Sequence, residues 1–181
     1  MSKLVLGLDV STSATGICII DPSVPTGPGG PHIRHLDAIL FKGCKTLWDK
    51  ADEVERKLRE FKDVGIGTFA LEEPLLGFSK GLSSAGTITT LMRFNGIVSY
   101  IGRNVFGVEP TYLSAASARK SCGVKLVKRS VGGPQKEQVF THMSQNDLAY
   151  VDWPKKKSGQ PVDWSRDATD AYVIARAACL L

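Results

Sequence analysis

The fold can be predicted from the stretch Leu4-Val5-Leu6-Gly7-Leu8-Asp9-Val10-Ser11-Thr12-Ser13-Ala14-Thr15-Gly16, near the start of the chain. Residues 4–9 form an apolar run that ends in an acid, a pattern typical of a buried strand. The small and polar residues 10–14 predict a turn, and residues 15–21 predict a second strand. With a third strand at 36–42, this opening predicts an antiparallel meander that carries Asp9 at the end of its first strand.

The rest of the chain alternates between the two kinds of element. The ten residues 22–31 hold four prolines and three glycines, so we expect a loop there. Later strands are expected at 68–72 and 108–113, and helices at 46–62, 85–105, 115–122, 135–144 and 167–181. Residues 152–162 form a polar insert. This order predicts one α/β domain over residues 1–181, with helices on both faces of its sheet.

The composition is that of an ordinary folded domain. Of the 181 residues, 43% are hydrophobic and 23% are charged, which excludes a chain that is mainly disordered. No apolar run approaches the ~20 residues of a membrane span, and the first residues do not form a secretory signal. The four cysteines are too few and too scattered for a disulfide framework, so we expect reduced thiols inside a cell. The net charge of +5 hints at a polyanionic partner.

Four carboxylates stand at the ends of predicted elements. Asp9 and Glu72 each close an apolar strand, and Asp167 and Asp170 lie three residues apart on one face of the last helix. An acid in such a place is costly to bury unless it is paired or binds a metal. Mg²⁺ prefers oxygen ligands, and four convergent carboxylates would hold two ions ~3.5–4 Å apart, the arrangement used for in-line phosphodiester displacement.

Each acid also has a simpler interpretation. Asp167 would cap the last helix, with Asp170 in the first turn where the helix dipole favours an acid. Asp9 would be an ordinary residue at the start of a turn. Glu73 and Glu72 point to opposite sides of a strand, so at most one of them is expected to bind a metal. The joint order of the acids indicates a shared site more strongly than any single acid does.

Three acidic blocks together resemble the RuvC-type Holliday junction resolvases of the RNase H-like superfamily. The blocks are Leu6-Gly7-Leu8-Asp9-Val10-Ser11, Phe69-Ala70-Leu71-Glu72-Glu73 and Arg166-Asp167-Ala168-Thr169-Asp170-Ala171. The resemblance covers almost the whole chain in order. It implies an RNase H-like fold, with a mixed sheet of three antiparallel strands plus parallel strands, and a homodimer that nicks four-way or branched DNA. Ser11 stands where the family usually has glycine, which suggests a divergent member.

The resemblance also implies roles for individual residues. Metal ligation would belong to Asp9, Glu72, Asp167 and Asp170, with two Mg²⁺ ions per site and Mn²⁺ as a substitute. Lys136 and Arg119 fall where the family has basic residues near the scissile phosphate, and Lys136 would neutralise charge in the transition state. A resolvase of this kind is expected in the cytoplasm of a bacterium or a phage-infected cell, with an organelle as the alternative.

Two further segments are candidates for contact with DNA. From Arg119 to Lys136 there are six basic residues and no acid, and the segment contains Lys120, Lys125, Lys128 and Arg129. With three glycines it predicts a flexible loop that binds phosphates by counterion release, although a merely solvated loop is the alternative. The loop after Glu72 carries Leu75, Phe78 and Lys80, which would insert into a base step, as the resemblance supports, or would fold into the core.

Two apolar features leave alternatives open. Residues 85–105 are more apolar than one buried face requires, which predicts either a dimer seam or a fully buried helix. The insert carries Lys155, Lys156 and Lys157 between Trp153 and Trp164. Its tryptophans would either stack on an unpaired base or pack on the domain.

Other classes of function fit the sequence less well. Cys44, His32 and His35 do not have the spacing of a zinc site. The turn after Asp9 also resembles the phosphate-binding opening of sugar kinases and actin-like ATPases, but the chain is too short for their two lobes. A nuclease acting on RNA or on branched DNA in general stays open, as does a non-catalytic nucleic-acid-binding relative.

Overall fold

The structure is a computed structural model that describes residues 3–26, 30–74 and 85–181. Its sheet has the strand order β3-β2-β1-β4-β5. The strands are β1 (Leu4–Asp9), β2 (Ala14–Thr26), β3 (Gly30–Leu40), β4 (Ile66–Glu72) and β5 (Pro110–Leu113). Strands β1, β2 and β3 are antiparallel neighbours, whereas β1, β4 and β5 run parallel. The mixed sheet of three antiparallel strands plus parallel strands is therefore confirmed.

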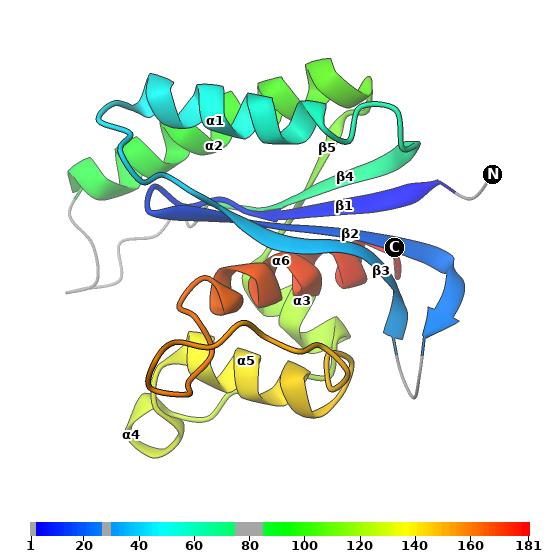
Figure 1. Ribbon diagram of the computed structural model, residues 1–181, viewed down its shortest axis with the longest axis vertical. Helices are drawn as coiled ribbons and strands as arrows, with labels where there is room; N and C mark the ends of the chain where they lie inside the picture. Colours follow the sequence, from blue (N-terminus) through cyan, green and yellow to red (C-terminus); the bar gives the residue numbers. More distant parts are fainter. Residues whose placement is uncertain (1–2, 27–29, 75–84) are drawn as a thin grey trace.

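Helices cover both faces of this sheet, as the order of elements predicted (Figure 1). One face carries α1 (Leu47–Arg59) and α2 (Ala85–Phe106), and the other carries α6 (Ser165–Ala178) with α3 (Ala115–Ser121) and α5 (Gln135–Gln145) beneath it. A short helix, α4 (Arg129–Gly132), precedes α5 and was not predicted. Each face has its own apolar core. None of the helices in the described ranges has the length and apolar character that crossing a membrane requires.

The loop predicted at 22–31 is wrong for most of its length. Strand β2 continues to Thr26 and β3 begins at Gly30, so Pro22, Pro25 and Pro31 lie in strands and not in a loop. The register shifts between Asp21 and Pro25. Strand β2 pairs with β1 only through residues 16–20 of β2. Beyond Ile20, the edge of β2 that faces away from β3 therefore has no neighbouring strand among the described residues to which a backbone N–H must donate. Proline is tolerated at such an edge, and turn composition alone could not show this.

Helix α1 begins where the sequence predicted it. Thr46 accepts a hydrogen bond from the Asp49 N–H, and the Asp49 carboxylate accepts one from the Thr46 N–H, which forms a capping box. Its apolar face buries Ala51, Val54 and Leu58. These contacts fix α1 over the antiparallel strands.

Helix α2 buries only one of its faces. Phe94 and Val98 are fully buried, whereas Met92 and Tyr100 are 43% and 63% exposed. The alternative of a fully buried helix is therefore wrong. An apolar outer face remains on α2 and requires another explanation.

Helix α6 packs directly on β1 at Gly7. A Cβ added there would lie 2.5 Å from the Ala171 carbonyl oxygen and 2.5 Å from the Ala175 nitrogen of α6. Both are backbone atoms, so the helix itself would have to move. The missing side chain at Gly7 thus sets how closely α6, and the acids at its start, approach the sheet.

We predict that Gly7→Ala lowers the free energy of unfolding by about 2–3 kcal/mol, because it forces a helix off the central strand. Gly96→Ala is the matched control, since a Cβ added at Gly96 on α2 meets nothing within 4 Å. Alanine favours a helix over glycine, so this control should gain up to about 1 kcal/mol. Urea unfolding measures both variants, and equal effects would contradict the close packing at Gly7.

Candidate active site

The four predicted acids come together at one edge of the sheet. Asp9 ends β1 and Glu72 ends β4, and the pairing of Leu8 with Leu71 in these parallel strands places the two acids side by side. Asp167 and Asp170 lie near the start of α6. The helix begins at Ser165 with Trp164 at its cap position, so the alternative that Asp167 caps this helix is wrong.

A second glycine allows α6 to reach Asp9. Gly16 of β2 pairs with Asp9 of β1. A Cβ added at Gly16 would lie 2.0 Å from the Asp167 carbonyl oxygen, so any side chain here would push the first turn of α6 away. Gly16 was part of the stretch from which the fold was predicted, but its role in the site was not foreseen.

The Lys136 ammonium lies at the centre of the site. Its Nζ is 2.6 Å from Asp167 Oδ1, 3.1 Å from Asp9 Oδ2 and 3.4 Å from Asp170 Oδ2. Asp9 and Asp170 are buried, at 7% and 4% exposed, whereas the lysine side chain is half-exposed. One flexible cation therefore joins three carboxylates that would otherwise repel one another.

The carboxylates carry more negative charge than this lysine balances. Burial raises the pKa of Glu72 to about 7, and the charge of Asp9 adds to the rise. Burial also raises the pKa of Asp9 and the pKa of Asp170, while Lys136 acts in the opposite direction. Burial lowers the pKa of Lys136, but its acidic neighbours, with Asp9 first among them, raise that pKa above the usual value. A site of this kind favours the entry of further positive charge.

A second ion pair next to Lys136 also joins α5 to α6, and here α5 supplies the acid and α6 the base. Glu137, the next residue of α5, accepts hydrogen bonds from Arg166 Nε at 2.9 Å and from Arg166 Nη2 at 3.1 Å. The Arg166 guanidinium also lies over the Phe140 ring, 4.4 Å from its centroid. Residues 136–137 and 166–167 thus form two adjacent bridges between α5 and α6. The Glu137–Arg166 pair was not predicted, although the reversed order of charges in residues 136–137 and 166–167 was a usable signal.

Two other positioning residues were missed. Asn95, a buried polar residue of α2, donates from Nδ2 to the Glu72 carbonyl oxygen at 3.1 Å and fixes the end of β4. Lys50 of α1 donates to the Thr12 carbonyl oxygen at 2.6 Å in the turn after Asp9. No non-glycine residue in the described ranges has a positive φ, so the turn after Asp9 accommodates Ser11 without backbone strain. A polar residue in an apolar helix was the signal that could have identified Asn95.

Arg119 is a second cation close to the acids. Its positive charge partly offsets the rise in the pKa values of Glu72, Asp9 and Asp170 that burial causes. The residue is half-buried, and its guanidinium forms no hydrogen bond or ion pair with a residue that the structure describes. A cavity of about 480 Å³ touches both Arg119 and Glu72. The guanidinium is therefore available to an anion that enters beside the acids.

The basic segment before Lys136 is more ordered than predicted. It contains α4, and the Gln138 side chain bonds to the Val127 carbonyl oxygen at 3.1 Å and to the Gly133 carbonyl oxygen at 3.0 Å. The expectation of a simple flexible loop is wrong for this reason. Its basic side chains at 120, 125, 128 and 129 are exposed. Leu75, Phe78 and Lys80 lie outside the described residues.

The insert is anchored by one of its tryptophans. Trp153 is only 8% exposed, and its ring centroid lies 5.5 Å from that of Phe140 and 6.4 Å from that of Trp164. Base stacking by Trp153 is therefore excluded, and this tryptophan packs on the domain. Trp164 is half-buried, and Lys155, Lys156 and Lys157 are exposed.

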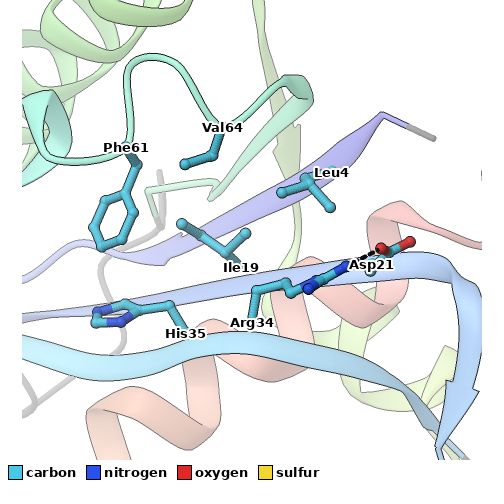
Figure 2. Close-up of a pocket in the computed structure, with 7 residues that line it drawn as sticks. All are labelled: Leu4, Ile19, Asp21, Arg34, His35, Phe61 and Val64. Atoms are coloured by element: carbon cyan, nitrogen blue, oxygen red, sulfur yellow. Dashed lines mark hydrogen bonds and ion pairs between the residues drawn. The ribbon is translucent and has the colours of Figure 1, made fainter. Parts of the chain in front are cut away.

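A separate cavity of about 500 Å³ lies at the opposite end of β1 (Figure 2). Leu4, His35 and Phe61 line it, and an Arg34–Asp21 ion pair of 3.0 Å forms part of its wall. Leu4 and Asp9 are five residues apart along an extended strand, a span of roughly 16 Å. This cavity is therefore not part of the acidic site.

The acidic site fits a hard divalent cation in its chemistry. Its candidate ligands are carboxylate oxygens, which Mg²⁺ prefers, and burial leaves them short of positive charge. Among the residues that the structure describes, no group of three histidine, cysteine or acidic side chains is arranged to hold a metal ion as it stands. The Lys136 ammonium instead occupies the space between three carboxylates, as a stand-in cation on a side chain that can rotate away.

Comparison with solved structures identifies the fold. No protein-family model and no curated protein matches the chain. The chain is similar to the structure of T. thermophilus RuvC in complex with a Holliday junction substrate, with a TM-score of 0.64 and 12% identity over 97% of this chain and 91% of that chain. It is also similar to a Thermus thermophilus RuvC structure, with a TM-score of 0.57 and 14% identity over 96% and 92% of the two chains. The chain therefore has the RNase H-like fold of RuvC in a divergent form.

We predict that Lys136→Met lowers the free energy of unfolding by about 1–2 kcal/mol at neutral pH, a value reduced because the lysine is half-exposed. The physical reason is the repulsion among the carboxylates that remain. Adding Asp167→Asn to this variant should restore at least half of the loss, because it removes one of those charges.

Lys125→Met is the matched control, since Lys125 is an exposed lysine of the neighbouring basic segment. Chemical denaturation would compare the four proteins. A Lys136→Met variant as stable as the control, or a double variant less stable than Lys136→Met alone, would contradict the bridging role of the ammonium.

Proposed function

We propose that this protein is a Holliday junction resolvase, an endonuclease that nicks four-way or branched DNA at the acidic site. The observation that carries the proposal is the convergence of Asp9, Asp167 and Asp170 on one ammonium, with Glu72 beside them, in a chain with the RuvC fold. Buried acid would repel the phosphates of a nucleic acid unless cations neutralise it. The arrangement therefore suits cation-assisted cleavage better than simple binding.

The acids would hold two Mg²⁺ ions. One ion would bind Asp9 together with Asp167 or Asp170, and the other would bind between Asp9 and Glu72. Bound Mg²⁺ supplies Lewis-acid stabilisation of the phosphate and an activated water for in-line attack.

The basic residues would act on the phosphate itself. Lys136, which lies 2.6–3.4 Å from three of the acids, would turn to a phosphate bound there, and its ammonium would offset charge that develops in the transition state. Arg119 would hold a nonbridging oxygen from the Glu72 side, because its half-buried guanidinium has no partner among the described residues.

The wider DNA contact would follow the exposed bases. Lys120, Lys125, Lys128 and Arg129 would neutralise backbone phosphates, which makes binding weaker as salt rises. Leu75, Phe78 and Lys80 would enter the junction beside Glu72, a role that stays a prediction from the sequence. The hydrogen bonds between the Gln138 side chain and the backbone of residues 127 and 133 would hold the basic segment in one conformation against the DNA.

Asp9→Asn should lower the cleavage rate of a synthetic four-way junction in Mg²⁺ by at least about 100-fold, because it removes a ligand shared by both ions. Binding of the junction in Ca²⁺ should stay within a fewfold of the wild type. Gel assays on a labelled junction measure both quantities.

Asp63→Asn is the matched control, since Asp63 is an exposed acid in the turn before β4, at the opposite end of that strand from Glu72. It should cleave as fast as the wild type. Cleavage by Asp9→Asn at the control's rate would refute the role of the acids, and equal loss of binding and cleavage would point to misfolding instead.

A homodimer would present two such sites to the two strands that must be nicked. The outer surface between α1 and α2 is apolar, and a cavity of about 590 Å³ there is lined by Trp48, Ile97 and Tyr100. Trp48 and Tyr100 are 69% and 63% exposed. A second copy of the same surface would cover these side chains, and this use would account for the large apolar residues that α2 exposes.

Light scattering should give a mass near twice the 19.6 kDa of one chain for the wild type. Tyr100→Glu should give a monomer, because it places a charge in the apolar seam. Tyr150→Glu, at a tyrosine that is 55% exposed outside this seam, should stay dimeric. A monomeric wild type would remove the dimer from the proposal.

A further inference from the structure

A cavity of about 620 Å³ adjoins the acidic site on the side away from Glu72. Asp167 belongs to both the cavity and the acidic site, so a ligand could occupy the two at once. Ser13, from the turn after Asp9, also borders the cavity. The cavity therefore opens next to the position where a scissile phosphate would lie.

The walls of the cavity are mostly apolar and partly uncovered. Leu40, at the end of edge strand β3, is 51% exposed, and Val162 and Trp164 face the same space. A leucine so exposed beside a half-buried tryptophan forms a surface that would suit the flat face of an aromatic ring.

The insert at residues 152–162 forms the remaining wall of the cavity. It is a small hairpin closed by hydrogen bonds from the Lys156 N–H to the Gln160 carbonyl oxygen at 2.7 Å and from the Val162 N–H to the Pro154 carbonyl oxygen at 2.9 Å. Buried Trp153 fixes its base to the domain. The segment follows α5 and leads back into α6, in orange in Figure 1. The wall is thus preformed.

The charge at the rim indicates the class of ligand. Lys156 and Asp163 both line the cavity and form an ion pair, and Lys155 and Lys157 are exposed next to Lys156, so lysines still outnumber the acid of this rim. A flat apolar surface with lysines at its rim matches an unstacked nucleobase with its phosphates, because every base has a π-face and every nucleotide carries a negative charge.

We propose that this cavity binds the nucleotide next to the scissile phosphate, with its base unstacked against Trp164 and Leu40 and its outer phosphate near Lys156. This inference rests on the proposed nuclease function and deepens it, because it adds a base pocket on the insert side of the acids. The pocket makes cleavage depend on a base that can leave its stack, as bases at a junction centre do more easily than bases in a duplex.

The test is a double-mutant cycle between the pocket and the base. Four-way junctions carry an abasic residue on the 5′ or the 3′ side of the scissile phosphate, and kcat/KM is measured in Mg²⁺. For the wild type, one of the two abasic junctions should be cut about tenfold more slowly than the intact junction, the loss that removal of one base–aromatic stack produces.

Leu40→Ser and Trp164→Ala should each lower kcat/KM about tenfold on the intact junction. On that abasic junction, which already lacks the base, each should lower kcat/KM only slightly further. Leu40→Ser keeps the test valid if Trp164→Ala fails to fold, because Leu40 is exposed on an edge strand. Val24→Ser is the matched control, an exposed apolar residue of β2 away from the cavity, and it should keep the full abasic penalty.

Three outcomes would overturn the proposal. Two of them leave the nuclease function standing: no abasic penalty in the wild type, or a penalty that is as large in Leu40→Ser as in the wild type. A wild type that cuts neither intact nor abasic junctions would instead refute the proposed function and the pocket together.

Discussion

The arrangement of this molecule depends on the contact between the Lys136 ammonium and three aspartates that come from β1 and α6. Burying like charges at one sheet edge is unfavourable unless a cation lies between them. Lys136 meets this need from a third segment, at 2.6–3.4 Å from each aspartate. The same contact therefore joins α5 and α6 to the central strand and keeps the acids close together. A lysine that is half-exposed can also leave, which a permanently buried cation could not do.

The surrounding fold is built to hold these groups at that spacing. Gly7 and Gly16 allow α6 to lie directly on β1 and β2, so the start of the helix comes level with Asp9. Asn95 fixes the end of β4 beside Asp9, and the Glu137–Arg166 ion pair holds the start of α5, and with it Lys136, against α6. Each device acts through the backbone or through a neighbouring charge. Small changes at residues that never touch substrate should for this reason alter the acidic site.

Much of this could be predicted from the sequence because it is local or periodic. An apolar run ending in Asp9, a capped amphipathic α1 and an acid pair at the start of α6 each leave a readable pattern, and their order gave the fold and the four acids. The partner of the acids was harder to foresee. Lys136 lies 127 residues from Asp9, and only the family resemblance suggested that it belonged to the site.

The failures have physical causes of the same kind. The proline-rich ends of β2 and β3 were taken for a loop because composition does not reveal which strand edges are unpaired, and pairing of β2 with β3 extends to Thr26. The basic segment was taken for a flexible loop because its order comes from one distant side chain, Gln138. Trp153 and Trp164 could not be told apart by sequence, although one is in the core and the other borders a cavity.

The most direct test of the account is cleavage by the wild-type protein of matched four-way, Y-shaped and linear duplex DNA, with Mg²⁺ and with a chelator. The account predicts that Mg²⁺ supports rapid nicking of the four-way junction, slower nicking of the Y-shaped substrate and little of the linear duplex, and that the chelator stops all three. Equal cutting of the three substrates would contradict selectivity for junctions. No cutting of the four-way junction in Mg²⁺ would contradict the assignment of the acidic site as a nuclease centre.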